Sequence, residues 1–284
     1  ASSDSMKSTL SNDGINKLRQ DYPAYESKIL AYEDRAGEIN SLLEQMNGDE
    51  ARENFVLENL ADFDTIRGLS ARFQNDEEKL QTVFNFQGSL ADLKVVSDLI
   101  KDENFIGGQD FLFENLDRLE VLEVEVNQIP TFIDLADQYD YNPDSMDVVF
   151  ANPEKAGKLR DLGENLPTLK SELLANVDQL DVIDDLAAEF ADVYGKVSVE
   201  KMSIVFANTQ KAVKLRDLSK DLQGKGDDLL ANVGQLDVIG ELATEFANDT
   251  EKMSLVFANS GKAVQLRDLS KDLQGKGDDL LANV

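Results

Sequence analysis

Cysteine, histidine and tryptophan are absent from this chain of 284 residues, and proline occurs only five times. Without cysteine there is no disulfide, no thiol nucleophile and no iron–sulfur cluster. Without cysteine and histidine the usual zinc ligands are missing, and so is the commonest general acid–base side chain. These absences exclude several large classes of enzyme, and we expect no cofactor.

Basic residues are scarce relative to acidic ones. The chain has 28 Lys and Arg against 56 Asp and Glu, a formal net charge of −28. Because phosphate groups repel such a surface, we expect no nucleic-acid partner. Long hydrophobic runs are lacking too, since none approaches the roughly 18 apolar residues of a membrane span. The sequence therefore predicts no transmembrane segment.

Repetition is the strongest positive signal. Residues 202–233 and 253–284 are nearly identical, and a third copy begins at Met146. Phe150, Phe206 and Phe257 mark the same position in the three copies, at spacings of 56 and then 51 residues. Self-similarity at such a period is typical of proteins built from tandem structural repeats.

Degenerate copies extend this pattern toward the N-terminus. The spacing lengthens to 66 residues between Phe84 and Phe150, which indicates an insertion near residues 121–130. We expect it to be helical, although 121–126 alternates like a strand. The predicted division is 1–55 as a degenerate N-terminal helical repeat, 56–112, 113–172 with the insertion, 173–228, 229–279, and 280–284 as the start of a further, truncated repeat.

Apolar spacing divides each copy into three helical segments. The first predicts one helix of roughly twenty residues with a single apolar stripe, weakened in the last copy by Gly234 and Gly240. Its stripe consists of Leu229, Val233, Leu236, Ile239, Leu242 and Phe246. The second segment is short, with Met253, Val256 and Phe257. The third carries Ala263, Leu266, Leu269 and Leu273.

Polar residues mark the expected helix ends. Asn152 precedes Pro153, which favours Asn152 as the N-cap of the third segment, and Asn208 and Asn259 occupy the same place. Asn142 precedes the second segment in the same way. Gly224 supplies a C-terminal stop. Because one such unit cannot bury its own apolar stripes, we predict an all-α fold of tandem helical repeats, about three helices per 51–66-residue unit, stacked as an α-solenoid-like rod.

No catalytic motif or phosphate-binding loop is present. One calcium candidate is formed by Asp140, Asn142 and Asp144, which place oxygen ligands at alternate positions. The segment lacks the glycine at the sixth position and the glutamate at the twelfth that calcium loops use. Helix capping is therefore the favoured interpretation, and a cation site is the alternative.

Two features indicate assembly. Arg160, Arg216 and Arg267 recur in a Leu-Arg-Asp-Leu motif, and we expect either a charge ladder between neighbouring repeats or a solvent-facing stripe of little energetic value. Leu280, Leu281 and Val284 begin an apolar stripe that the sequence does not complete. We expect further copies, or another molecule, to cover this end.

The function predicted from these patterns is a non-enzymatic structural repeat protein. We expect a self-associating component of an extracellular filament or a cell-surface adhesion structure, whose partner is the chain itself. The alternative is an intracellular α-solenoid scaffold in the cytoplasm, which binds a basic or helical protein. An enzyme or the regulatory part of one is the third class, and no set of residues in the sequence supports it.

Overall fold

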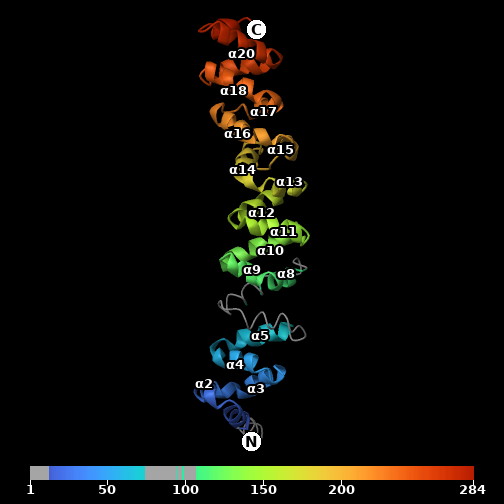
Figure 1. Cartoon of the computed structure of the whole chain (residues 1–284), viewed down its shortest axis with the longest axis vertical. Helices are drawn as coiled ribbons and strands as arrows, with labels where there is room; N and C mark the ends of the chain where they lie inside the picture. The colour runs from blue at the N-terminus through green and yellow to red at the C-terminus, as the bar shows by residue number, and fades with distance from the viewer. Residues whose placement is uncertain (1–12, 74–93, 95–97, 99–106) are drawn as a thin grey trace. The chain divides into compact units, whose positions relative to one another are not determined.

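Helices dominate the computed structural model, which describes residues 13–73, 94, 98 and 107–284. Within these residues there is no strand, and a single antiparallel bridge joins Ala191 to Val197. The all-α prediction is therefore confirmed. The chain forms two compact units, Ala1–Ile133 and Asp134–Val284, which we call the N-terminal and C-terminal units (Figure 1). The early copy of the second segment, at residues 80–84, lies outside the described residues.

The N-terminal unit begins with a helical segment at residues 13–21. Its short 3₁₀ turns are η1 (Pro23–Tyr25), η2 (Glu33–Arg35), η3 (Leu60–Asp62) and η4 (Val126–Gln128). Its α-helices are α2 (Glu26–Ala31), α3 (Ala36–Gln45), α4 (Glu50–Glu58), α5 (Phe63–Phe73), α8 (Gly108–Glu114) and α9 (Leu116–Val121), and α10 (Ile129–Gln138) spans the division between the units.

The C-terminal unit continues with the same alternation of helices and 3₁₀ turns. Its first half contains α11 (Pro143–Ala151), η5 (Pro153–Lys155), α12 (Ala156–Asn165), α13 (Lys170–Ala175), η6 (Val177–Gln179) and α14 (Leu180–Glu189). Its second half contains α15 (Val199–Phe206), η7 (Thr209–Lys211), α16 (Ala212–Asp221), α17 (Gly226–Ala231), η8 (Val233–Gln235), α18 (Leu236–Glu245), α19 (Thr250–Ala258), η9 (Ser260–Lys262), α20 (Ala263–Asp272) and α21 (Gly277–Leu281).

The local building block is a helix, a 3₁₀ turn and a ten-residue helix, as in α13–η6–α14 and again in α15–η7–α16. One copy of the sequence repeat therefore contains four α-helices, and the predicted count of about three is wrong. The predicted repeat boundaries also fall inside helices, namely α4, α8, α13, α17 and α21. Each predicted boundary marks the start of an apolar stripe, and that point does not coincide with a helix end.

The extra helix arises because the predicted twenty-residue helix is broken. In the last copy α17 ends at Ala231 and α18 begins at Leu236, with η8 between them. Glycine does not cause the break, since α13 and α14 are separated in the same way by Val177–Gln179, which contains none. The apolar stripe continues across the 3₁₀ turn, and for this reason its spacing imitates that of one helix.

An asparagine occupies each of these breaks. In α17–η8 the Asn232 side-chain amide donates a hydrogen bond of 2.8 Å to the Asp228 carbonyl oxygen four residues earlier. The Asn232 carbonyl oxygen then accepts from the backbone N–H of Gln235, which closes the turn. The same side-chain bond recurs at Asn59, Asn115, Asn152, Asn176, Asn208, Asn259 and Asn283. We call joint asparagines those that a 3₁₀ turn follows, namely Asn59, Asn152, Asn176, Asn208, Asn232 and Asn259.

This geometry corrects the predicted role of Asn152, Asn208 and Asn259. None of them accepts an N-cap hydrogen bond with its side chain, because each amide instead donates backward to the preceding helix. Asn142 does cap α11, since its side chain accepts from the backbone N–H of Ser145 at 2.9 Å. Helix α16 already ends at Asp221, and Gly224, with φ +78°, lies in the turn that follows, which the Lys225 backbone N–H closes by donating to the Leu222 carbonyl oxygen.

Replacing a joint asparagine should destabilise the 3₁₀ turn that follows it. We expect Asn232→Ala to lower the free energy of unfolding of the C-terminal unit by roughly 0.5–1.5 kcal/mol, because the Asp228 carbonyl oxygen loses the side-chain donor and keeps only the backbone N–H of residue 232. Asn165→Ala is the matched control, since the exposed Asn165 makes the same bond to Asp161 but no 3₁₀ turn follows it. Urea denaturation followed by circular dichroism measures both changes. Equal losses would contradict a special role for the joint.

The predicted insertion near residues 121–130 forms neither a strand nor a continuous helix. Helix α9 ends at Val121, Glu123 adopts a left-handed backbone with φ +53°, and η4 leads into α10. The alternating apolar residues of this segment therefore lie in the turn that connects two helices, and not in a strand.

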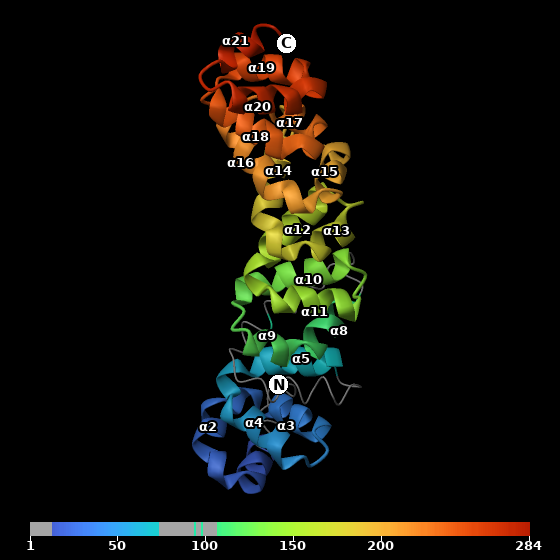
Figure 2. The same cartoon turned by 45° about the horizontal axis from the view of Figure 1, so that its top comes forward.

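Within the C-terminal unit the ten-residue helices pack in series, α12 on α14, α14 on α16, α16 on α18 and α18 on α20 (Figure 2). The predicted third-segment stripe is buried in α12 and α16. Small residues recur at the eighth position of these helices, as Gly163, Ala187, Ser219, Ala243 and Ser270. At Gly163 a Cβ atom would lie 2.3 Å from the Gln138 side-chain oxygen. This position therefore permits close packing of neighbouring segments.

In the part of the chain that the structure describes, no helix combines the length and the apolar character needed to cross a membrane.

Candidate interaction surfaces

The recurring arginines make ion pairs with the ten-residue helix before their own. Arg160 lies 3.8 Å from Asp134, Arg216 lies 3.9 Å from Asp185, and Arg267 lies 3.6 Å from Glu241. Each arginine also donates to the aspartate that follows it in sequence. A ladder is therefore present, but each pair lies inside one predicted repeat and does not join neighbouring repeats as expected. The reason is that two ten-residue helices belong to each repeat.

Lysines that the sequence reasoning missed connect neighbouring repeats instead. Lys158 of α12 reaches Asp181 of α14 at 2.6 Å, and Lys214 of α16 reaches Asp237 of α18 at 2.5 Å. Lys158 also lies 3.3 Å from Asp184, a position taken by Gly240 in α18. These ion pairs could have been predicted from the sequence, because lysine recurs at the third position of one ten-residue helix and aspartate at the second position of the next.

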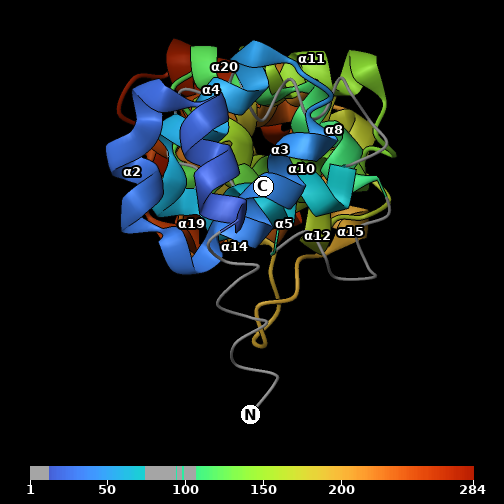
Figure 3. The ribbon, with the colours of Figure 1, turned by 90° about the horizontal axis from the view of Figure 1, so that it is seen from below.

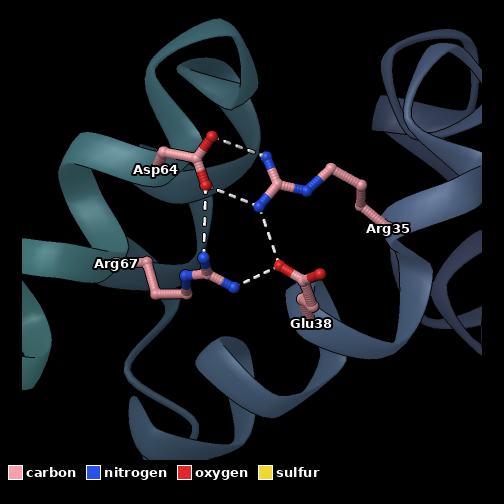
Figure 4. A network of polar contacts seen from close by, with 4 residues as sticks. All are labelled: Arg35, Glu38, Asp64 and Arg67. Carbon is pink, nitrogen blue, oxygen red and sulfur yellow. Dashed lines mark hydrogen bonds and ion pairs between the residues drawn. The ribbon is translucent and has the colours of Figure 1, made fainter.

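The N-terminal unit has charges at the same helix positions. Arg35 donates to both carboxylate oxygens of Asp64, at 3.0 and 2.5 Å, and to Glu38 at 2.7 Å (Figure 4). Arg67 closes the network by donating to Glu38 and to Asp64. Glu38 and Arg67 correspond to Lys158 and Asp184 of the C-terminal unit with the signs of charge exchanged. The ion pair between the two helices is therefore retained, but the acidic and basic residues have exchanged helices.

This network makes a pH-dependent contribution to stability. The hydrogen bond from Arg35 is the main cause that lowers the pKa of Asp64 and that of Glu38 in the folded chain. Because folding lowers both values, the contribution is complete above the ordinary carboxyl range and is lost as pH falls through the folded pKa values. We expect Arg35→Gln to raise both pKa values in a carbon-detected NMR titration. The stability difference between Arg35→Gln and the parent chain should shrink in acid, and a constant difference would contradict this assignment.

The calcium candidate behaves as a helix start. Asn142 caps α11, and Asp144 lies in the first turn of that helix. Asp140 and Tyr141 adopt left-handed backbone conformations, with φ of 52° and 53°. Among the described residues no group of three or more acidic side chains is arranged to hold a metal ion. The structure thus brings Asn142 into a capping role and does not assemble a cation site.

The α20–α21 end of the C-terminal unit has an apolar face. Leu281 is buried and contributes nothing to it, whereas Leu280 and Val284 are half-buried. Its main exposed residues are Leu269 (47% exposed) and Leu273 (48%), which the sequence reasoning assigned to a buried stripe. Their counterparts in α16, Leu218 and Leu222, are 8% and 0% exposed. Helix α16 packs against α14, α17 and α18, whereas α20 packs against α18 and α21.

A second exposed feature is the α14–α15 connection, residues 190–198. Val193 is 94% exposed and Tyr194 is 92% exposed at its tip. The connection is ordered by its own hydrogen bonds, because the Asp192 carboxylate accepts the backbone N–H groups of Tyr194 and Lys196, each at 2.9 Å. Figure 3 shows it projecting from the helices of its unit. We call this segment the tip loop.

A groove of about 720 Å³ lies between α16 and α18. Its apolar residues include Val213, Leu218 and Gly240. Four carboxylates also line it, from Asp217, Asp221, Asp237 and Glu241, together with the ammonium group of Lys214, which pairs with Asp237 at 2.5 Å. The groove is widened by Gly240, since the corresponding Asp184 reaches Lys158 across the α12–α14 contact.

Comparisons with protein-family models, with curated proteins and with solved structures find no match to this chain.

Proposed function

We propose that this chain is a non-enzymatic structural repeat protein that self-associates. Its helix pairs stack in the manner of an α-solenoid, each ten-residue helix packing on the next. Support comes from the serial packing of α12, α14, α16, α18 and α20, and from the lysine–aspartate pairs that recur between them. An extracellular filament or a cell-surface adhesion structure suits its acidity and its lack of cysteine.

The observation that carries this proposal is the unequal exposure of equivalent leucines. Leu218 and Leu222 are covered by a following helix pair, whereas Leu269 and Leu273 present the same apolar surface to solvent. The internal repeat itself therefore indicates what fits this face, namely another helix pair of the same kind. Burying about half of two leucine side chains and their surroundings supplies a favourable hydrophobic contribution to association.

Sedimentation velocity of the purified chain over a wide concentration range tests the proposal. We expect concentration-dependent oligomers in the parent chain and their loss in the double variant Leu269→Lys with Leu273→Lys. Val264→Lys is the matched control, because Val264 is 44% exposed and its counterpart Val213 stays 47% exposed. A parent chain that remains a monomer at every concentration would overturn the proposal.

An intracellular scaffold is the second candidate, and the α16–α18 groove with its four carboxylates favours it. A basic or helical protein would bind there through salt-sensitive contacts. Under this alternative the parent chain stays monomeric alone, and a lysine-rich helical peptide binds it at low salt and leaves at high salt.

A further inference from the structure

We propose that the tip loop of one molecule docks in the α16–α18 groove of a second molecule of the same chain. This inference rests on the proposed self-association and adds a lateral contact to the one at the α20–α21 face. The tip loop and the groove belong to one unit, so each molecule offers both halves of the contact. Because the two surfaces differ, the contact is heterologous and continues from molecule to molecule.

The tip loop is not required to connect its helices. The equivalent connection from α18 to α19 consists of residues 246–249 only, whereas residues 190–198 connect α14 to α15. The five additional residues form an ordered turn with Gly195 at φ +79°, and the backbone N–H of Asp192 donates to the Lys196 carbonyl oxygen at 2.9 Å. A turn that is ordered before binding loses little conformational entropy on docking. Its fully exposed Val193 and Tyr194 are thus presented on a rigid support.

The groove offers matching space and chemistry. Its volume of about 720 Å³ falls within the ~300–1,000 Å³ typical of sites that accept small ligands. Exposed apolar contact is available at Val213, which is 47% exposed, beside the open space at Gly240, and tyrosine is a residue type favoured at the centre of interfaces. The four surrounding carboxylates provide acceptors for the Tyr194 hydroxyl group.

Charge complements this shape. Lys196 lies beside the tip, and its ammonium group makes no ion pair among the described residues. Asp221, at the groove, likewise has no ion-pair partner within the described part of the chain. Each therefore has a charge available for the other in a chain that is otherwise strongly acidic. Lys196 therefore gives the tip loop a cationic group for the acidic groove, while the loop's own Asp192 carboxylate is occupied by backbone N–H groups.

The absence of cysteine permits a clean crosslinking experiment. Chains carrying Tyr194→Cys are mixed with chains carrying Asp217→Cys, and disulfide-linked heterodimers are quantified on non-reducing gels after mild oxidation. The matched control is Asp161→Cys, because Asp161 occupies the position of Asp217 in α12, where Asp184 fills the adjacent space. We expect at least about tenfold more heterodimer with Asp217→Cys than with Asp161→Cys, and equal yields would overturn the inference.

Two further variants test the contact without cysteine. Gly240→Asp fills the groove with the side chain that Asp184 supplies elsewhere, and a Cβ there meets Lys214 and Leu218 in ordinary contact, at 3.4 and 3.8 Å. In the second variant residues 190–198 are replaced by the four-residue connection of 246–249. We expect either change to weaken the loop-dependent association by at least about tenfold, with unchanged helical circular dichroism.

These outcomes separate the two proposals. If the parent chain associates, and Leu269→Lys with Leu273→Lys abolishes this while Gly240→Asp and the shortened loop do not, then the lateral contact is wrong and the end-face contact stands. If the parent chain never associates, both fail. Crosslinking of Tyr194→Cys to a position outside the groove would also overturn the docking inference.

Discussion

Leu222→Ala is expected to lower the free energy of unfolding by about 2–5 kcal/mol, whereas Leu273→Ala is expected to cost far less. The two leucines occupy the same place in near-identical copies, but Leu222 is 0% exposed and Leu273 is 48% exposed. Truncation of Leu222 removes buried methyl groups and leaves a cavity between α16 and its neighbours. Truncation of Leu273 removes groups that already contact water.

Hydrogen exchange in the full chain measures this difference locally. Amides of α16 and α17 should lose protection in Leu222→Ala, and those of α20 and α21 should change little in Leu273→Ala at low protein concentration. The comparison also bears on self-association. Equal losses of protection at the two sites would mean that Leu273 is covered in solution. Repeating the measurement at rising protein concentration shows whether self-association makes Leu273→Ala as destabilising as Leu222→Ala.

Phe63→Ala is expected to have a comparable effect in the N-terminal unit, about 3–5 kcal/mol. Phe63 begins α5 and is 1% exposed, and its ring lies 4.8 Å from the Arg35 guanidinium and 5.6 Å from that of Arg67. Loss of the ring therefore removes a large buried side chain and two cation–π contacts, and it also removes the surface that orients the network of Figure 4.

Phe63→Leu is the matched control, since the corresponding helices α14 and α18 begin with Leu180 and Leu236, which are 0% and 1% exposed. We expect a smaller loss from Phe63→Leu, because leucine already fills this position twice in the same chain. Hydrogen exchange in α3 and α5 should increase more than about a hundredfold in Phe63→Ala, with helices of the C-terminal unit as an internal reference. Unchanged protection in α3 and α5 would contradict the burial of Phe63 in the core of the N-terminal unit.

The candidate surfaces were only partly accessible from the sequence. Arg160, Arg216 and Arg267 were identified by repetition, but their partners depend on which helices are adjacent, and the extra break in each repeat changes that adjacency. In the sequence, the five additional residues of the tip loop are visible only as a change of repeat spacing from 56 to 51 residues. The groove exists because Gly240 has no side chain. The sequence does not show this, because only the structure places Gly240 next to Lys214 and shows that Asp184 fills the equivalent space between α12 and α14.

The sequence alone determined that the chain is helical, because apolar residues recur with helical spacing and no alternating run is long enough for a sheet. It also determined which residues of the third segment are apolar, and that no cysteine or histidine chemistry is available. Tertiary structure decided the rest. A 3₁₀ turn at each joint asparagine preserves the phase of the apolar stripe, so periodicity cannot reveal the break. Burial depends on the neighbouring helix, and for this reason the same leucine is covered in α16 and exposed in α20.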